Sequence, residues 1–198
     1  MKNKWLILAG AVALTAFSTA QATPIGITGE VDMNGTVTLN VGDLSTAVAA
    51  LGFSGVQVGA QAGNATGSFA GTANDNVTWH AFAFSGGSAN PLWTYSDAGT
   101  GWTYSFQLLN DAVTLQNSIN LNISGTGILS ITGGSSNFAP TTGSWAFSIN
   151  NSGGQTHPDF NFTFANSQTA VVPDGGATVM LLGAALSALG LFRKKLIA

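Results

Sequence analysis

Few side chains in this sequence could perform catalysis, and they are widely spaced. The 198-residue chain has two histidines, His80 and His157, eight Asp and Glu residues and no cysteine. A zinc site needs three or four converging ligands, so one here would have to combine both histidines with aspartates. A Ser-His-Asp triad converges only in the fold and is not excluded by spacing, but no G-x-S-x-G nucleophile elbow occurs. We therefore expect no enzyme activity, no catalytic or cofactor-binding residue and no metal site.

Calcium is the one cofactor kept as an alternative. Residues 32–35 (Asp-Met-Asn-Gly) and 73–76 (Ala-Asn-Asp-Asn) carry the carboxylate and amide oxygens that Ca²⁺ accepts. Asn-Gly is also the preferred pair of a tight hairpin turn. We prefer the turn interpretation and expect no bound cofactor.

The cationic side chains lie only at the two ends of the chain. They are Lys2 and Lys4 before one apolar run, and Arg193, Lys194 and Lys195 after another. Between the two ends lie all eight acids and no Lys or Arg, so this part carries a charge of about −8. Nucleic acid is excluded as a partner because binding its phosphates depends on Lys and Arg. Basic groups that flank apolar runs are typical of proteins moved across a membrane.

The first apolar run predicts a secretory signal peptide over residues 1–22. A basic start is followed by 13 apolar residues, 5–17, and by a small-x-small cleavage site at Ala20-Gln21-Ala22. The alternative is an N-terminal membrane anchor, but at about 1.5 Å per residue this run spans only about 20 Å, less than the hydrocarbon core of about 30 Å. We expect cleavage after Ala22.

The second apolar run predicts a transmembrane helix over residues 177–192, followed by the basic stop at 193–195. The run is apolar on all faces, and a basic triplet directly after it indicates a membrane segment. Its 16 residues are slightly short, so snorkelling basic groups or local bilayer thinning would cover the mismatch. The alternative is a buried C-terminal helix of the domain.

A short motif directly precedes this run. Its residues are Val172, Pro173, Asp174, Gly175, Gly176 and Thr178, and Leu181-Leu182-Gly183 follows. The stretch 172–195 resembles the C-terminal sorting signal of the PEP-CTERM class, in its VPDSG-CTERM variant, although Gly175-Gly176-Ala177 stands where the variant has Ser-Gly-Ser. Pro173 keeps the chain extended, and the two glycines let an active site approach the backbone closely.

The resemblance implies a partner and a location. The partner is an exosortase, a transpeptidase-like membrane enzyme that cuts near the motif and releases or transfers the protein to the outside. The resemblance therefore implies an exported protein, held in the membrane by its C-terminal helix before processing and located at the cell surface or outside the cell afterwards. A GPI signal combines the same ingredients of small residues and a discarded apolar tail.

Residues 23–170 predict one all-β domain, which we expect to be a β-sandwich; residues 171–198 form the sorting signal. Short alternating runs are broken by Gly, Asn, Ser and Pro, without a long helical period. The expected strands are 25–31, 36–41, 77–84, 92–96, 102–108, 118–124, 128–132, 144–150 and 160–164. One short helix is expected at 43–51, with Asp43 or Ser45 as its cap.

Aromatic residues alternate along several expected strands. Trp102, Tyr104 and Phe106 share one face of a strand because side-chain direction repeats every two residues, and positions 82–84, 145–147 and 160–164 show the same pattern. We expect these rows to form the buried core of the sandwich. The alternative is an exposed platform for sugars, to which Trp79, Trp93 and Trp102 would contribute.

The segment 120–164 adds a second resemblance. It is similar to the final strands of many PEP-CTERM-type exported proteins, in which a Ser-Gly-Thr-Gly turn, here 124–127, precedes a Pro-Thr-x-Gly-x-Trp-x-Phe strand, here 140–147. The resemblance suggests a shared type of exported domain and no particular chemistry.

The combined prediction is an exported structural or interaction protein of the cell surface or extracellular matrix, without catalysis. The first alternative is a lectin-like glycan-binding β-sandwich with extracellular polysaccharide as its partner. The second is a single-pass membrane protein that is never cut.

Overall fold

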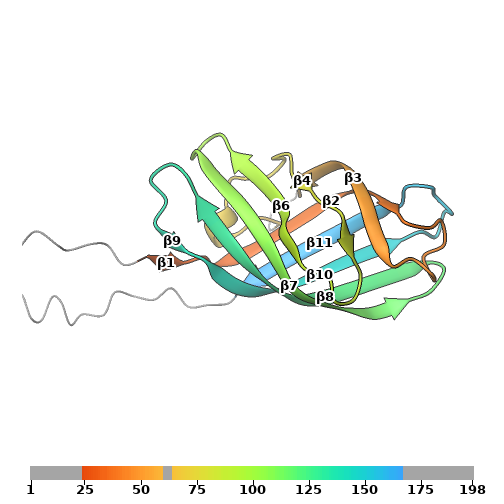
Figure 1. Cartoon of the computed structure of the whole chain (residues 1–198). Helices are drawn as coiled ribbons and strands as arrows, with labels where there is room; N and C mark the ends of the chain where they lie inside the picture. The colour runs from red at the N-terminus through yellow and green to blue at the C-terminus, as the bar shows by residue number, and fades with distance from the viewer. Residues whose placement is uncertain (1–23, 60–63, 167–198) are drawn as a thin grey trace, which may run out of the picture.

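The computed structural model describes residues 24–59 and 64–166, and this part of the chain is almost entirely β-strand (Figure 1). Its elements are β1 (Ile25–Gly26), β2 (Gly29–Leu39), β3 (Ala49–Val58), the 3₁₀ turn η1 (Gly67–Phe69), β4 (Thr78–Trp79), β5 (Phe82–Ala83), β6 (Ala89–Asp97), β7 (Trp102–Gln116), β8 (Asn120–Thr132), β9 (Phe138–Ala139), β10 (Thr141–Asn150) and β11 (Asp159–Asn166). The predicted all-β class is confirmed. Among the described residues, no helix has the length and apolarity needed to cross a bilayer.

Nine strands form one antiparallel sheet in the order β4-β6-β7-β8-β10-β11-β2-β3-β5. Four of the eight adjacent pairs, β6-β7, β7-β8, β10-β11 and β2-β3, are also consecutive along the chain, which is typical of hairpin-built sheets. The pair most distant in sequence is β11 beside β2, where Phe162 lies opposite Met33. This pairing joins the last described strand to one of the first. A separate parallel pair is made by β1 and β9, with Ile25 opposite Phe138.

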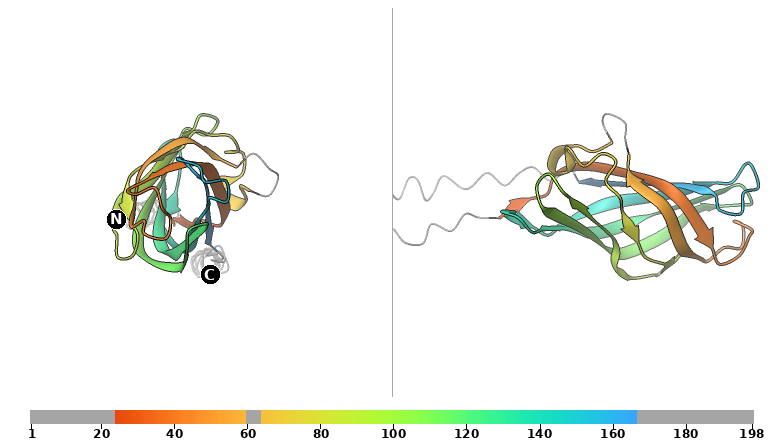
Figure 2. Two further views of the ribbon diagram at one scale, coloured as in Figure 1. Left: turned by 90° about the vertical axis from the view of Figure 1, so that its right-hand side faces the viewer. Right: turned by 90° about the horizontal axis from the view of Figure 1, so that it is seen from above.

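The segment 76–84, which we call the closing segment, joins the two edges of this sheet. Its first residues lie beside β3, because the Val77 amide donates to the Val56 carbonyl over 2.9 Å. It then crosses to β6, where Trp79 lies opposite Trp93. It returns to β3 through β5, and the Phe84 amide donates to the Val48 carbonyl over 2.8 Å. The sheet is therefore curled around an enclosed interior, as the end-on view in Figure 2 shows.

This curl corrects the predicted sandwich. A sandwich packs two separate sheets face to face, whereas here β2 to β8, β10 and β11 belong to one continuous sheet. The alternating pattern is the same in both arrangements, because each buries one face of every strand. Local periodicity therefore could not distinguish them.

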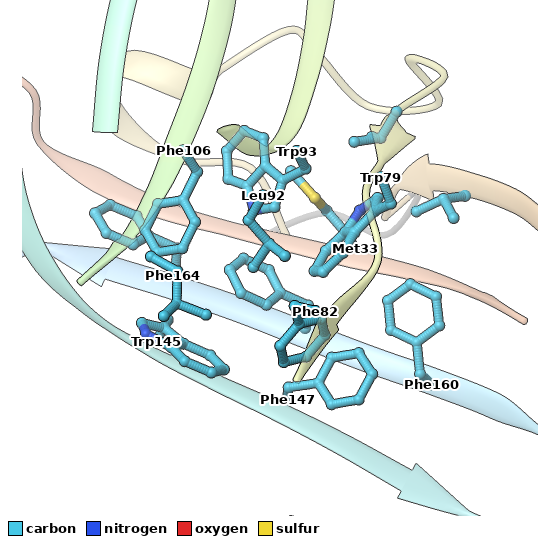
Figure 3. Close-up of a cluster of buried hydrophobic side chains, with 14 of the residues drawn as sticks. Met33, Trp79, Phe82, Leu92, Trp93, Phe106, Trp145, Phe147, Phe160 and Phe164 are labelled. Atoms are coloured by element: carbon cyan, nitrogen blue, oxygen red, sulfur yellow. The ribbon is translucent and has the colours of Figure 1, made fainter. Parts of the chain in front are cut away.

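The interior is filled by the alternating aromatic rows. Tyr104 and Phe106 on β7 are buried, as are Trp145 and Phe147 on β10 and all three phenylalanines of β11. Figure 3 shows labelled members of these rows, such as Phe106 and Phe147, gathered inside the curl with Trp79 and Phe82 of the closing segment. Trp79 lies with its ring centroid 4.9 to 6.1 Å from four phenylalanines: Phe53, Phe147, Phe160 and Phe162. The prediction that the rows form the core is confirmed.

Two glycines make room for two of these rings. Gly127 on β8 lies directly opposite Gly143 on β10. A Cβ at Gly127 would collide with the ring of Phe106, and one at Gly143 would collide with the ring of Phe164. The expected turn at 124–127 is therefore wrong, because these residues continue β8, and the glycines serve close packing rather than chain reversal.

Two further local predictions are also wrong. Asn34-Gly35 is not a hairpin turn but lies inside β2, where the pairing with β3 shifts register between Asn34 and Thr36. A Cβ on Gly35 would lie 2.9 Å from Val56 Cγ2, so this bulge requires glycine for close approach. The expected helix at 43–51 is a turn followed by β3. The Asp43 carboxylate does accept the Ser45 amide at 2.9 Å, but Ala49 and Ala50 pair with β5 instead of continuing a helix.

Candidate functional site

On β8, β10, β11 and β2 the outer face of the sheet carries mainly uncharged polar side chains, and Glu30, Asp32 and Asp159 are the acids among them. Inward positions of β8, β10, β11 and β2 hold buried apolar residues, so the alternate positions point outward. Antiparallel partners that lie opposite each other share one face, and their side chains form rows across the strands. Register therefore decides which polar groups become neighbours.

One such row crosses six segments of the chain and consists mainly of amides. We call it the amide row; it comprises Asn122, Ser148, Asn161, Asn34, Gln57 and Asn76. Strands lie about 4.7 to 4.9 Å apart, so each member lies close to the next. The residues come from positions 34 to 161 of the chain, and the pairing of β11 with β2 brings its two halves together.

In the described part of the chain, side chains at or beside each end of the amide row are hydrogen-bonded to each other, whereas those at its centre are not. Gln57 Nε2 donates to Asn76 Oδ1 over 3.2 Å, which satisfies one end of the amide row. Beside the other end, Asn150 Nδ2 donates to Asn120 Oδ1 over 2.9 Å. Within residues 24–59 and 64–166, the central side chains, those of Asn122, Ser148, Asn161 and Asn34, make no hydrogen bond. Their donors and acceptors are available to a ligand.

Two open hollows lie along the amide row and share Asn161 and Asp159. The first, of about 440 Å³, is lined by Asn122, Ser148 and Asn150 among others. The second, of about 700 Å³, extends over β2 and β3 along Asn34, Thr36 and Ser54. Asp159 places one carboxylate in both hollows. The surface can therefore offer hydroxyls, amides and a single negative charge to a bound molecule.

The titratable groups with shifted pKa lie elsewhere and have structural causes. Burial, assisted by the negative charge of Asp97, raises the pKa of Asp75. Burial also raises the pKa of Tyr104 to about 12, and it raises the pKa of Tyr95 further. Tyr95 donates to the Thr72 hydroxyl and Tyr104 to the Ser68 carbonyl. These phenols stay protonated at neutral pH and brace the fold beneath η1.

The histidines and the calcium candidates do not converge. His80 and His157 are both exposed, and His157 Nδ1 lies 3.0 Å from the Thr38 hydroxyl. In the parts of the chain that the structure describes, no group of three or more His, Asp and Glu side chains could hold a metal ion. Asp32 and Asp75 each have one buried carboxylate oxygen without a partner.

The tryptophans that could have formed a sugar platform face the interior. Trp93 is fully buried and Trp79 is 9% exposed, because both point into the curl. Trp102 is partly exposed and packs edge-on against Phe138 at 5.2 Å. No pair of accessible, coplanar tryptophan rings exists in the described residues, so the surface that the lectin alternative relied on is not formed by these residues.

The two ends of the described domain emerge together. Asn166, the last residue of β11, lies opposite Gly29 at the start of β2, and its side-chain amide donates to the Ile27 carbonyl over 2.9 Å. The loops β2–β3, β7–β8 and β10–β11 gather at the other end of the molecule (Figure 1). The chain therefore leads toward both terminal segments from one end and presents its loops at the other.

The expected sorting and processing residues lie outside the described residues. These are Ala20 and Ala22 at the signal cleavage site, Val172, Pro173, Asp174, Gly175, Gly176 and Thr178 in the motif, and Arg193, Lys194 and Lys195 in the basic stop. Their placement, and that of the helix expected at 177–192, stays a prediction from the sequence.

Comparison with known proteins supports the C-terminal motif directly. A family model for the VPDSG-CTERM motif matches residues 171–196. The chain thus carries a PEP-CTERM-type sorting signal, which indicates an exported protein sorted to the envelope and implies processing by an exosortase-type enzyme. No curated protein and no solved structure matches the chain.

Sequence reasoning missed the amide row. β8 and β11 show the signal locally, as Asn or Asp residues that alternate with apolar residues at 120–123 and 159–162. The row forms only because particular strands are neighbours in the sheet. No local sequence pattern predicts that β11 pairs with β2.

Proposed function

We propose that this chain is a non-enzymatic interaction protein of the cell surface or extracellular matrix, without a cofactor. The VPDSG-CTERM match at residues 171–196 is the observation that carries the proposal. In this proposal residues 1–22 direct export and are removed, and the domain folds outside. The helix at 177–192 and the basic stop hold the tail in the membrane until the exosortase acts.

The fold is compatible with a domain that is anchored at one end and makes its contacts through its exposed surface. Because β1 begins and β11 ends at one end of the domain, a C-terminal anchor leaves the outer face and the loop end free. The described domain has no Lys or Arg, and its outer face bears mainly hydroxyls and amides. Such a surface suits contact with neutral hydrophilic matrix better than contact with anionic polymers.

The test is the mass of the exported product in a host that has an exosortase. The unaltered chain should appear outside the membrane, shortened by the signal peptide and by most or all of residues 171–198. A variant with Pro173→Ala, Asp174→Ala and Gly176→Ala should keep its tail and remain in the membrane fraction. Replacing Ser167, Gln168 and Thr169 with alanine serves as the matched control and should leave processing unchanged.

Two outcomes would contradict the proposal. If the unaltered chain kept its tail in the membrane, it would be the single-pass protein of the second alternative. If the motif variant were processed like the unaltered chain, the motif would not be the recognised element.

A further inference from the structure

The strongest unexplained feature of the described domain is the free centre of the amide row. The side chains of Asn122, Ser148, Asn161 and Asn34 make no hydrogen bond to the described residues, although side chains at or beside both ends of the row do. Each asparagine side chain offers two donors and an acceptor. On a solvent-exposed sheet face, threonine and other β-branched residues have the higher strand propensity and asparagine is depleted. Packing therefore gives no reason for asparagines here.

We propose that this face, from β8 to β3, binds a neutral polysaccharide chain, with Asn161 and Asn34 at the centre of the contact. The inference rests on the proposed function, since it names the partner that an exported interaction protein of this kind would meet. The glycan lies across the strands, in the two hollows that share Asn161 and Asp159.

The hydrogen-bonding chemistry favours hydroxyl groups as partners. A sugar hydroxyl both donates and accepts, so vicinal hydroxyls match the paired donor and acceptor of one asparagine amide. The row repeats such amides at the strand spacing of about 4.7 to 4.9 Å, so successive sugars along one chain can each find a partner. An extended peptide would instead need free backbone groups at a sheet edge, and the central members of the row lie on inner strands of the sheet.

The charge of the face excludes anionic polymers. Asp159 lines both hollows, and residues 24–166 contain no Lys or Arg to neutralise a carboxylate, sulfate or phosphate on the ligand. An anionic glycan would therefore be repelled, whereas the Asp159 carboxylate can accept hydrogen bonds from a neutral sugar.

The contact is weak at each site. A net hydrogen bond contributes about 0.5 to 1.5 kcal/mol, and no exposed aromatic ring lines either hollow. Useful attachment then comes from many copies of the protein on one polysaccharide. An assay that detects weak, rapidly reversible binding is needed.

Affinity electrophoresis meets this requirement. The full chain is purified in a polyoxyethylene detergent, which has no sugar headgroup, so the assay does not depend on export or processing. The purified protein is then run in native gels that contain one dissolved polysaccharide each. The neutral probes are dextran, mannan and a mixed-linkage β-glucan, and alginate is the anionic probe. We expect slower migration with at least one neutral polysaccharide and unchanged migration with alginate.

The variants locate the site. Asn34→Val combined with Asn161→Val keeps residues suited to a strand and removes the central amides. The variant should weaken retardation about tenfold. The control combines Gln107→Val with Ser130→Val, two partly exposed positions on β7 and β8 outside both hollows, and should migrate like the unaltered chain.

Each other outcome overturns the inference. No retardation by any of the three neutral polysaccharides, stronger retardation by alginate, or equal loss of binding in the control would do so. A dimer in analytical ultracentrifugation that only the Asn34/Asn161 variant abolishes would show that the face binds a second copy instead. The binding assay uses the detergent-purified chain and does not require processing. If no polysaccharide binds, the proposal that the tail is a sorting signal still stands. If the tail is not processed in the host, the binding result still stands.

Discussion

Asp111 on β7 holds the loop between β5 and β6 through Gly86, whose amide donates to Asp111 Oδ1 over 2.6 Å. The amides of Ser85 and Gly87 donate to the same carboxylate over 2.7 and 3.1 Å. Ser85 has a φ of 72° and Gly86 a φ of 87°, so the loop is left-handed at two successive residues. A non-glycine residue in that region is strained, and the three hydrogen bonds offset the strain.

Replacing Asp111 with alanine should therefore lower the free energy of unfolding by about 1 to 3 kcal/mol, because hydrogen bonds to a charged group are lost. Urea denaturation followed by tryptophan fluorescence measures the change. Asp159→Ala is the matched control, since that carboxylate accepts no hydrogen bond from the described residues, and its effect should stay within about 0.5 kcal/mol. An equal loss in both variants would show that the loop does not depend on Asp111.

The Gly127–Gly143 pair leads to a second prediction. Gly127→Ala places a methyl group where the Phe106 ring lies and should destabilise the domain by at least about 1 to 3 kcal/mol. Gly52→Ala on β3 is the control, because its added Cβ would meet only Thr38 Cβ at 4.0 Å. That variant should be neutral or slightly stabilising. Thermal unfolding followed by circular dichroism compares them, and equal midpoints would refute the packing role of Gly127.

These glycines show where sequence reasoning succeeds and where it fails. Alternating aromatics at 102–106 and 160–164 correctly predicted strands and their buried face, because period two is a local property. A glycine interrupts that pattern in the same way whether it turns the chain or makes room for a side chain of another strand. Gly127 makes room for Phe106 and Gly35 for Val56, and only the three-dimensional positions of those two side chains show this.

The curl and the amide row were beyond prediction for the same reason. The two short strands of the closing segment pair with strands at opposite edges of the sheet, β4 with β6 and β5 with β3. Both pairings join parts of the chain whose contact a local pattern does not show. The Asp43–Ser45 contact that suggested a helix cap does form, but it closes only a turn, because Ala49 and Ala50 gain partners in β5. Tertiary pairing overrides that local preference.

The raised pKa of Asp75 gives a third prediction. Burial and the charge of Asp97 disfavour its ionised form in the folded state, so at pH 7 the charge costs stability. Asp75→Asn should raise the free energy of unfolding at pH 7. The gain should shrink as the pH falls through the folded pKa and vanish below the unfolded value of about 3.9.

A second variant, at a carboxyl whose pKa is lowered instead of raised, tests this explanation of the pH dependence. Hydrogen bonds from the Ser45 amide and hydroxyl lower the pKa of Asp43, so ionisation is favoured by folding. Asp43→Asn should therefore destabilise at pH 7, with the loss disappearing as the pH falls through the folded pKa. Urea titrations between pH 3 and about 7 measure both curves. Parallel curves for the two variants would rule out these electrostatic causes.

The basic stop gives a fourth prediction, which concerns the tail. Replacing Arg193, Lys194 and Lys195 with glutamine removes the groups that the proposed function uses to keep the end of the chain on the cytoplasmic side. Retention of the tail during export should be impaired, so a larger share of product should leave the membrane unprocessed. Intact-mass spectrometry of membrane and external fractions measures this. Unchanged masses and distribution would show that the cluster has no such role.

The closing segment gives the last prediction, through Trp79. This side chain is 9% exposed and contacts aromatic rings of β3, β10 and β11, so it links both sides of the curl. Trp79→Ala should lower the free energy of unfolding by about 3 to 5 kcal/mol. Trp102→Ala, which truncates a partly exposed ring packed mainly on Phe138, should cost clearly less. Urea denaturation followed by circular dichroism compares the two, and an equal cost would mean that the segment does not close the sheet through this residue.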